Sequence, residues 1–185
     1  LVIATPVSIV SAIGSASRRG VLIKGGAYLE QMGKVKAIAF DKTGTLTLGK
    51  LMVTDIEMVS HNINSQDLLI LAASIERMSE HPIAQAIVSK AEGLTFKPVT
   101  DFKAFIGKGA RACIEDQTIY IGNRRLFEEQ GHMLAPYEIN LTKLEQQAKT
   151  VLLIGTESEI YGIIAVADTL RESSKEALQS LRESG

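Results

Sequence analysis

A short apolar segment that runs directly into an acidic residue and a loop of glycine and threonine constrains this chain most. The segment is Val35–Phe40, VKAIAF, and the loop is Asp41–Thr47, DKTGTLT. An apolar run of this length predicts a short buried strand. Acidic residues at the carboxyl ends of such strands usually lie at the functional edge of an α/β sheet. We therefore expect an α/β core with Asp41 at the tip of one strand.

The residue types in this loop are suited to phosphate chemistry. The carboxylate of Asp41 is a nucleophile that has no proton to lose at neutral pH, and its attack on a phosphoryl group gives an acyl phosphate. The loop offers backbone N–H groups and hydroxyls to phosphate oxygens, and Gly44 permits a sharp bend. A carboxylate beside a phosphate needs Mg²⁺, for which Asp41 is one oxygen ligand. The alternative is a capped turn between two strands.

The rest of the chain alternates between helical and strand-like patterns. Strands are predicted at 53–59, 99–106, 110–114, 118–121, 151–154 and 160–166, and helices at 66–78, 83–91, 124–130, 141–149 and 173–182. Pro82 suits the first turn of its helix. Residues 53–166 therefore predict a compact α+β unit, inserted between the strand that ends at Asp41 and a segment that resumes near Asp168. This order implies two domains, one of them discontinuous.

The N-terminal stretch predicts part of a membrane helix. Leu1–Ser17 contains no charged residue, and Arg18 and Arg19 follow at once. A membrane helix needs about 20 apolar residues, so the stretch is slightly short, and a chain that starts inside the helix explains the difference. The paired arginines place the residues after them in the cytoplasm. The alternative is a buried helix of a soluble protein. The start at Leu1 and the end at Gly185 predict a longer parent protein.

Composition excludes several classes of function. The net formal charge is -1 over 185 residues, so no nucleic-acid partner is indicated. Cys113 is the single cysteine, which supports neither a disulfide framework nor a cysteine-based metal site. We expect Cys113 to be a small buried side chain in a strand.

The run DKTGTLT resembles the phosphorylation signature of P-type ATPases. The resemblance implies that Asp41 takes phosphate from ATP, that Lys42 assists at the phosphate, and that Thr43 contacts Mg²⁺ and phosphate. Asp41 and Thr43 are thus the expected metal-binding residues. The catalytic core is similar to the haloacid dehalogenase fold, whose phosphatases carry a second Asp where this chain has Thr43. Threonine is a poor proton carrier, so the acyl phosphate should be hydrolysed slowly.

Ser79-Glu80-His81-Pro82 resembles the Ser-Glu-His-Pro signature of the heavy-metal subclass of these pumps. The resemblance implies a nucleotide site that binds adenine without a phosphate-binding glycine loop of the Walker type. The matching positions are Glu76, His81, Gly107, Gly109, Gly122 and Asn123. Physically, an imidazole can stack on a purine, Glu76 can accept from its amino group, and glycines let a flat base approach closely.

The resemblance covers nearly the whole chain and implies its layout. Residues 1–19 correspond to the end of a transmembrane helix, and 20–49 to the first part of the phosphorylation domain. Residues 50–166 correspond to the nucleotide-binding domain, and 167–185 to the second, truncated part of the phosphorylation domain. The expected fold class is thus a partial α/β, haloacid dehalogenase-like domain with an inserted α+β domain. The full-length parent is expected to be a multi-pass protein of the cell membrane, cytoplasmic from about residue 18.

The implied function of the parent is ATP-driven export of a heavy-metal cation such as Zn²⁺, Cd²⁺ or Pb²⁺, with ATP and Mg²⁺ as cofactors. Its partners are the lipid membrane and the rest of the pump: the actuator domain, the membrane helices and the remainder of the phosphorylation domain. The fragment itself is expected not to turn over. Two alternatives stay open: a soluble haloacid dehalogenase-like phosphatase, and an ATP-binding module without catalysis.

Overall fold

The structure, a computed structural model, describes residues 4–183, which divide into two units. One unit contains the described residues up to Phe40 together with those from Glu176 onward, and the other is Asp41–Lys175. The strands of the described chain, from Thr47 to Leu170, all lie in the second unit.

The first unit contains the helix α1, Ala4–Arg18, and the short helix α2, Gly26–Met32. Helix α1 agrees with the expected helix between residues 4 and 18, while Leu1–Ile3 lie outside the described residues. The side chain of Ile9 packs against Gly26, where an added Cβ would meet Ile9 Cγ2 at 2.9 Å. Within residues 4–183, no helix has both the length and the apolar character needed to cross a membrane.

The predicted strand Val35–Phe40 is not formed. These residues have no regular secondary structure and lie exposed, and the apolar side chains of Val35, Ile38 and Phe40 are 51%, 52% and 40% accessible. A strand forms only when another strand supplies its hydrogen bonds. No described segment pairs with these residues, so their apolar character alone does not produce a strand.

The second unit is built on a six-stranded antiparallel sheet with the strand order β1-β6-β5-β4-β3-β2. The strands are β1 Thr47–Met58, β2 Thr100–Phe105, β3 Gly109–Ile114, β4 Gln117–Gly122, β5 Thr150–Gly155 and β6 Ile160–Leu170. The long ladder of β1 and β6 runs from Thr47↔Leu170 to Met58↔Gly162, with register shifts along it. Strand β1 therefore starts six residues before the predicted one, because its first residues pair with the end of β6.

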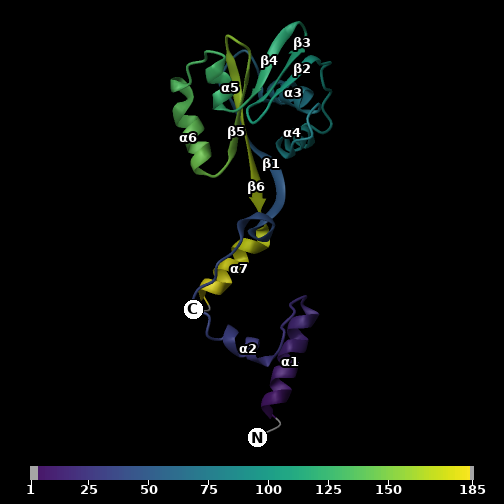
Figure 1. Cartoon of the computed structure of the whole chain (residues 1–185), viewed down its shortest axis with the longest axis vertical. Helices are drawn as coiled ribbons and strands as arrows, with labels where there is room; N and C mark the ends of the chain where they lie inside the picture. Colours follow the sequence, from purple (N-terminus) through teal and green to yellow (C-terminus); the bar gives the residue numbers. More distant parts are fainter. Residues whose placement is uncertain (1–3, 184–185) are drawn as a thin grey trace. The chain divides into compact units, whose positions relative to one another are not determined.

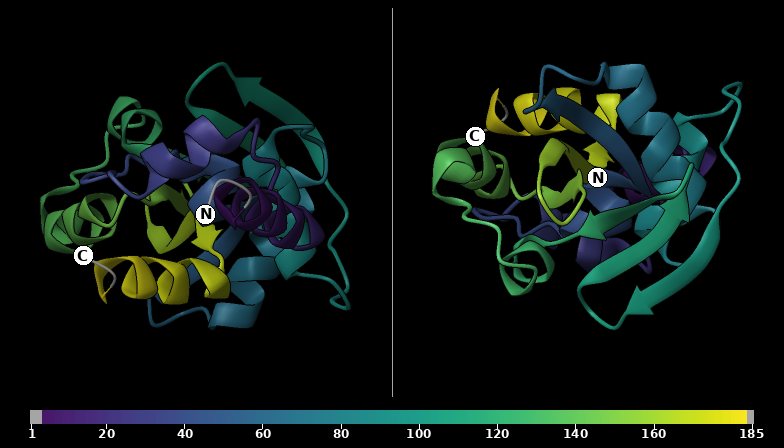
Figure 2. Two further views of the ribbon diagram at one scale, coloured as in Figure 1. Left: turned by 90° about the horizontal axis from the view of Figure 1, so that it is seen from below. Right: turned by 90° about the horizontal axis from the view of Figure 1, so that it is seen from above.

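Helices cover both faces of this sheet (Figure 1). They are α3 Ser65–Glu76 and α4 Pro82–Lys90 on one face, and α5 Arg124–Glu129 and α6 Glu138–Gln146 on the other. The 3-10 turn Ala135–Tyr137 leads into α6, and α7, Glu172–Glu183, follows β6. Figure 2 shows the same layers from two further directions, with the green helices on one side of β5 and β6 and the blue-teal helices on the other.

Alternation along the central strands builds two separate cores. In β5, Leu152 and Ile154 pack with α3 and α4, whereas Val151 and Leu153 pack with α5 and α6. Successive side chains of a strand point to opposite faces, so a continuously apolar strand fills both cores. The predicted α+β unit is thus confirmed as a sheet between two pairs of helices.

Candidate functional site

A cavity opens where the end of α3, the start of α4 and the turn between β2 and β3 meet. Its volume is about 370 Å³, which lies in the range of small-molecule sites. Apolar residues form much of its wall: Ile83, Ala84, Phe102, Ala104, Phe105, Ala110 and Leu152. The polar lining includes Glu76, Ser79, His81, Lys108, Asn123 and Thr150. A cavity with flat apolar walls and few polar groups suits a planar heteroaromatic ligand.

The structure brings five of the six predicted nucleotide residues to this cavity. Glu76, His81, Gly107, Gly109 and Asn123 line it, and Gly122 does not. Gly122 lies behind the lining, paired with Gly109 across β3 and β4. A Cβ at Gly122 would stand 2.3 Å from the backbone oxygen of Lys108. Its contribution is therefore the close approach of these two strands.

Glu76 is a buried carboxyl group at the C-terminal end of α3. Its side chain is 8% accessible, and burial raises its pKa from the ordinary 4.5 to about 7. Within residues 4–183 no hydrogen bond or ion pair joins this carboxyl group to another group, and neither of its oxygens is completely enclosed without a partner. A buried acid without a partner resists ionisation because its charge is poorly solvated. The carboxyl group of Glu76 is therefore free to form a hydrogen bond with a ligand in the cavity.

His81 forms the N-terminal cap of α4. Its Nδ1 atom accepts a hydrogen bond of 3.2 Å from the backbone N–H of Ile83, and Pro82 occupies the first turn as predicted. The cap satisfies one of the free N–H groups of the helix end and fixes the ring plane. With Nδ1 committed as an acceptor, Nε2 carries the hydrogen of a neutral ring. The exposed side of the imidazole remains available at the cavity.

The turn between β2 and β3 requires glycine at both ends. Gly107 has a φ of 69° and open space around its Cα, while Gly109 has a φ of 146°. A Cβ at Gly109 would lie 2.1 Å from the backbone oxygen of Ile121, a distance that no side chain tolerates. The absence of side chains at these positions leaves a bare backbone edge along the cavity.

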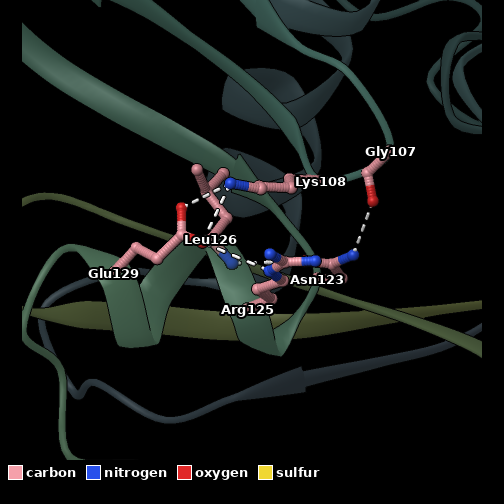
Figure 3. Close-up of polar contacts among 6 residues, drawn as sticks. All are labelled: Gly107, Lys108, Asn123, Arg125, Leu126 and Glu129. Carbon is pink, nitrogen blue, oxygen red and sulfur yellow. Dashed lines mark hydrogen bonds and ion pairs between the residues drawn. The ribbon is translucent and has the colours of Figure 1, made fainter.

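Asn123 holds this turn against α5 (Figure 3). Its Oδ1 caps α5 by accepting from Leu126 N at 3.2 Å, and its Nδ2 donates to Gly107 O at 2.9 Å. Its backbone N–H donates to Lys108 O at 2.8 Å. Lys108 Nζ also pairs with Glu129 at 2.6 Å, although this ion pair is partly exposed and contributes little. Asn123 is thus a positioning residue for the bare backbone edge.

The loop after Asp41 is held in shape by Thr47, whose side chain is completely buried. The Thr47 hydroxyl accepts from Gly44 N at 3.1 Å, and it lies within hydrogen-bond reach of Lys42 O and of the Asp168 carboxylate, to which it can donate. Gly44 has a φ of 77°, which is the sharp bend expected there. The side chains of Asp41 and Thr43 are exposed and make no hydrogen bond within residues 4–183. Both are therefore accessible from solvent.

Sequence reasoning missed the two residues that fasten this loop to the sheet, although it recognised their segment. Asp168 accepts a hydrogen bond of 3.0 Å from Gly49 N as well as the bond from Thr47. Arg171 donates from Nε to Thr47 O at 2.9 Å and from Nη2 to Gly44 O at 3.1 Å. A carboxylate near the end of β6 and a guanidinium directly after it, opposite a Gly/Thr loop, were the available signal. Together they form a clasp, which we define as Asp168 with Arg171.

Two negative observations limit the site. Among residues 4–183, no three or more His, Cys, Asp or Glu side chains gather in a way that could hold a metal ion. The cavity is lined by none of the described residues between Asp41 and Gly49. The candidate nucleophile and the cavity are therefore two separate sites within one unit.

Comparison with known proteins gives consistent results across the chain. The family described as haloacid dehalogenase-like hydrolase matches residues 35–185. A protein of Alkalihalophilus pseudofirmus named as a probable cadmium-transporting ATPase is 50% identical over 100% of this chain and 26% of its own length. The chain thus spans about a quarter of the length of the curated relatives that it matches.

Two solved structures are similar in fold as well. A zinc-transporting PIB-type ATPase in the E2.Pi state matches 100% of this chain and 30% of its own, with a TM-score of 0.87 and 39% identity. The N-domain of HMA8, a copper-transporting P-type ATPase, matches 63% of this chain and 99% of its own, with a TM-score of 0.53 and 26% identity.

Proposed function

Because the chain belongs to the haloacid dehalogenase-like hydrolase family and is similar throughout to heavy-metal P-type ATPases, we propose that it is the ATP-binding and phosphate-accepting segment of a metal-exporting pump. One observation carries the proposal: a single chain has a cavity lined by Glu76, His81 and Gly109 and also the preformed loop that follows Asp41. A nucleotide site and a nucleophile are the two elements that such a pump needs.

The cavity takes the adenine ring of ATP. Phe102, Phe105 and the imidazole of His81 supply flat surfaces for stacking, and Glu76 supplies a polar contact to the base edge. The bare backbone at Gly107 and Gly109 lets the ribose and phosphates leave the cavity without a steric clash. The triphosphate then extends from the cavity into solvent.

Asp41 receives the γ-phosphoryl group. A carboxylate oxygen forms a bond to the γ-phosphorus, the bond from that phosphorus to the β,γ-bridging oxygen breaks, and ADP leaves with the electron pair. Lys42 contributes a positive charge beside the transferred group. Thr43 occupies the position at which phosphatases of this fold have a proton-carrying Asp. A threonine hydroxyl transfers protons poorly. The acyl phosphate therefore persists, as a transport cycle requires.

The exposed oxygens of Asp41 and Thr43 fit a magnesium ion, which binds proteins through one or two carboxylates together with substrate phosphates. When bound there, the ion offsets the repulsion between a carboxylate and a phosphate. Asp41 would hold the ion by its carboxylate, and Thr43 would hold it by its hydroxyl or backbone oxygen.

The layout expected from the sequence remains part of the proposal. The proposed nucleotide-binding domain, 50–166, has 117 residues. The N-domain of HMA8 matches 63% of the 185-residue chain, which is also about 117 residues, and this agreement in size supports an inserted domain of the N-domain kind. Residues 1–19 are proposed as the end of a transmembrane helix, which would anchor the parent in a membrane. The ion is proposed as Cd²⁺, Zn²⁺ or Pb²⁺, in keeping with the named relatives.

Nucleotide binding by the 185-residue chain tests the proposal directly. We expect calorimetry to detect ATP binding and His81→Asn to weaken it about tenfold, since asparagine keeps the helix cap and removes the stacking ring. Gln85→Asn, on the exposed side of α4, is the matched control and should bind ATP as tightly as the unsubstituted 185-residue chain does. Equal affinity of the chain and of His81→Asn would place the nucleotide elsewhere.

A further inference from the structure

Lys108 is the one lysine or arginine among the described residues that line the cavity. It lies between Gly107 and Gly109, on the bare backbone edge over which the nucleotide tail is proposed to leave. Its backbone N–H donates to Phe105 O at 2.9 Å, and its carbonyl oxygen accepts from Asn123 N at 2.8 Å. The backbone of Lys108 is therefore fixed at the edge of the cavity, and only its side chain can change position.

The ammonium group of Lys108 is held by Glu129 of α5 (Figure 3). Lys108 Nζ lies 2.8 Å from one oxygen of the Glu129 carboxylate and 2.6 Å from the other. The side chains are 27% and 43% accessible, so water screens the pair and breaking it costs little free energy. This ion pair holds the side chain of Lys108 against α5, and the ammonium can exchange Glu129 for another anion.

Glu129 keeps a second partner when Lys108 leaves it. Arg125, one turn earlier on α5, donates from Nε to the same carboxylate at 3.2 Å. The two basic side chains and the one acidic side chain leave the cluster with a surplus of positive charge at the rim of the cavity. An incoming anion can therefore take the ammonium of Lys108 without leaving the carboxylate of Glu129 unpaired.

The phosphates of a nucleotide are a stronger partner for this ammonium than Glu129 is. A triphosphate carries several negative charges, whereas a carboxylate carries one, and Coulomb attraction grows with charge. A lysine binds phosphate as a point charge on a flexible four-carbon stem, so it needs no fixed angle of approach. Glycine on both sides of Lys108 leaves no side chain between its stem and a phosphate tail on the bare edge. The ammonium can thus turn from α5 to the tail.

Resting on the proposed function, we infer that Lys108 is a phosphate-binding residue of the nucleotide site, which leaves Glu129 when ATP binds and pairs with the phosphates instead. Glu129 then competes with the nucleotide for the same ammonium, and its removal strengthens ATP binding. The two partners of the ion pair therefore have opposite effects on affinity. A purely structural ion pair behaves differently, because it is lost in the same way whichever partner is removed.

The ratio of ATP to adenosine affinity, measured by calorimetry on the 185-residue chain without Mg²⁺, tests this inference. Adenosine has the same base and ribose but no phosphate, so effects on the base site cancel in the ratio. We expect Lys108→Met to lower the ratio about tenfold, the equivalent of one charge-assisted hydrogen bond, and to leave adenosine affinity unchanged. Glu129→Gln should raise the ratio about threefold, because it releases the ammonium.

A double variant and a second ion pair serve as controls. In the Lys108→Met background, Glu129→Gln should not raise the ratio, since no ammonium is left to release. Lys97 and Glu115 form a similar, partly exposed pair at 2.8 Å, and neither residue lines the cavity. Lys97→Met and Glu115→Gln remove the same charges at this other place and should leave the ratio as it is in the unsubstituted chain.

Several results would overturn the inference while ATP binding upholds the proposed function. One is a ratio that Lys108→Met does not lower, or that Lys97→Met lowers equally. Another is a Glu129→Gln variant that binds ATP less tightly, or that raises the ratio as much without Lys108 as with it. If the 185-residue chain binds neither ATP nor adenosine, the inference and the proposed function are both wrong.

Discussion

At the scale of single residues, the burial of Glu76 has a cost for folding that depends on pH. The unfolded chain ionises this group near its ordinary pKa of 4.5, whereas the folded chain does so only near 7. Between these values the unfolded state binds fewer protons than the folded state, so the free energy of unfolding falls as pH rises. This is the reverse of the usual behaviour of a paired carboxylate.

We predict that Glu76→Gln becomes more favourable to stability as pH rises, by about 2 kcal/mol between about pH 5 and about pH 8. The amide has no charge to desolvate, so its own contribution does not change over this range. Urea unfolding at the two pH values, followed by circular dichroism, measures the difference. A constant difference between the two proteins would mean that Glu76 is ionised as readily in the folded chain as in the unfolded one.

The two glycines of the turn between β2 and β3 should differ sharply in their tolerance of alanine. Gly109→Ala places a Cβ 2.1 Å from Ile121 O, and backbone must move to relieve it. We predict a loss of about 3 kcal/mol or more in the free energy of unfolding. Gly107→Ala meets open space and carries only the strain of a φ of 69°, about 1 kcal/mol.

Urea unfolding of both glycine variants provides the comparison, and ATP titration adds a functional reading. Gly109→Ala should lose nucleotide binding with its stability, while Gly107→Ala should remain folded. Equal stabilities for the two variants would show that β3 can separate from β4 at this point without cost.

At the scale of elements, the clasp of Asp168 and Arg171 holds the end of β6 to the loop after Asp41. Arg171 spans two carbonyl oxygens with its planar guanidinium, which a lysine cannot imitate. We predict that Arg171→Ala and Arg171→Lys both accelerate amide exchange at Gly44 and Gly49 at least about tenfold, equivalent to about 1.4 kcal/mol of local opening. Global stability should change by less, because the residue is exposed.

Hydrogen exchange followed by NMR measures this opening residue by residue. Lys175→Ala, an exposed change on the next helix, is the control and should leave both amides protected as before. Unaltered exchange in Arg171→Ala would indicate that Thr47 and Asp168 hold the loop without Arg171.

The elements that could be predicted are those whose pattern is local. Helix α4 was expected within a residue of its bounds, because Pro82 marks its start and apolar spacing marks its length. Strand β1 was expected to start at Val53 and starts at Thr47, since the sequence TLGKL becomes a strand only by pairing with β6. Val35–Phe40 was predicted to be a strand from its apolar pattern, but it forms no strand because no described segment pairs with it.

In the candidate site, too, the features that depend on local sequence could be predicted and those that depend on long-range contacts could not. The residues expected at the cavity came from ordered motifs, and five of them do line one space, while their nucleotide role stays a prediction. The clasp was not expected, because Thr47 and Asp168 are 121 positions apart. A contact of that separation depends on the strand register of a folded sheet, which spacing in the sequence does not reveal.

At the scale of the whole molecule, the proposed function requires a change in geometry. The cavity and the loop after Asp41 do not share lining residues, and β1 begins and β6 ends at that loop. On the proposed function, the triphosphate of a nucleotide in the cavity has to reach Asp41, and we expect a movement at the ends of β1 and β6 to bring it there. Since the clasp lies at those ends, the same residues that shape the loop also lie at the expected hinge.

The central prediction belongs to the full-length parent: an aspartyl phosphate forms at Asp41, and Asp41→Asn abolishes it. Asparagine is nearly the same size, so folding and ATP binding survive, whereas the anionic nucleophile is gone. Neither neighbour replaces it, because Lys42 is cationic and the exposed hydroxyl of Thr43 has no base bonded to it among the described residues. The parent in membranes, incubated with γ-labelled ATP and Cd²⁺, Zn²⁺ or Pb²⁺ and then quenched in acid, should carry label that hydroxylamine removes, as it does from acyl phosphates but not from phosphoserine. The 185-residue chain should label poorly, because Asp41 is the sole acidic group of its loop and full magnesium coordination needs more. Hydroxylamine-sensitive label that persists in Asp41→Asn would overturn the assignment of the nucleophile, whereas strong labelling of the short chain would overturn only the need for further ligands.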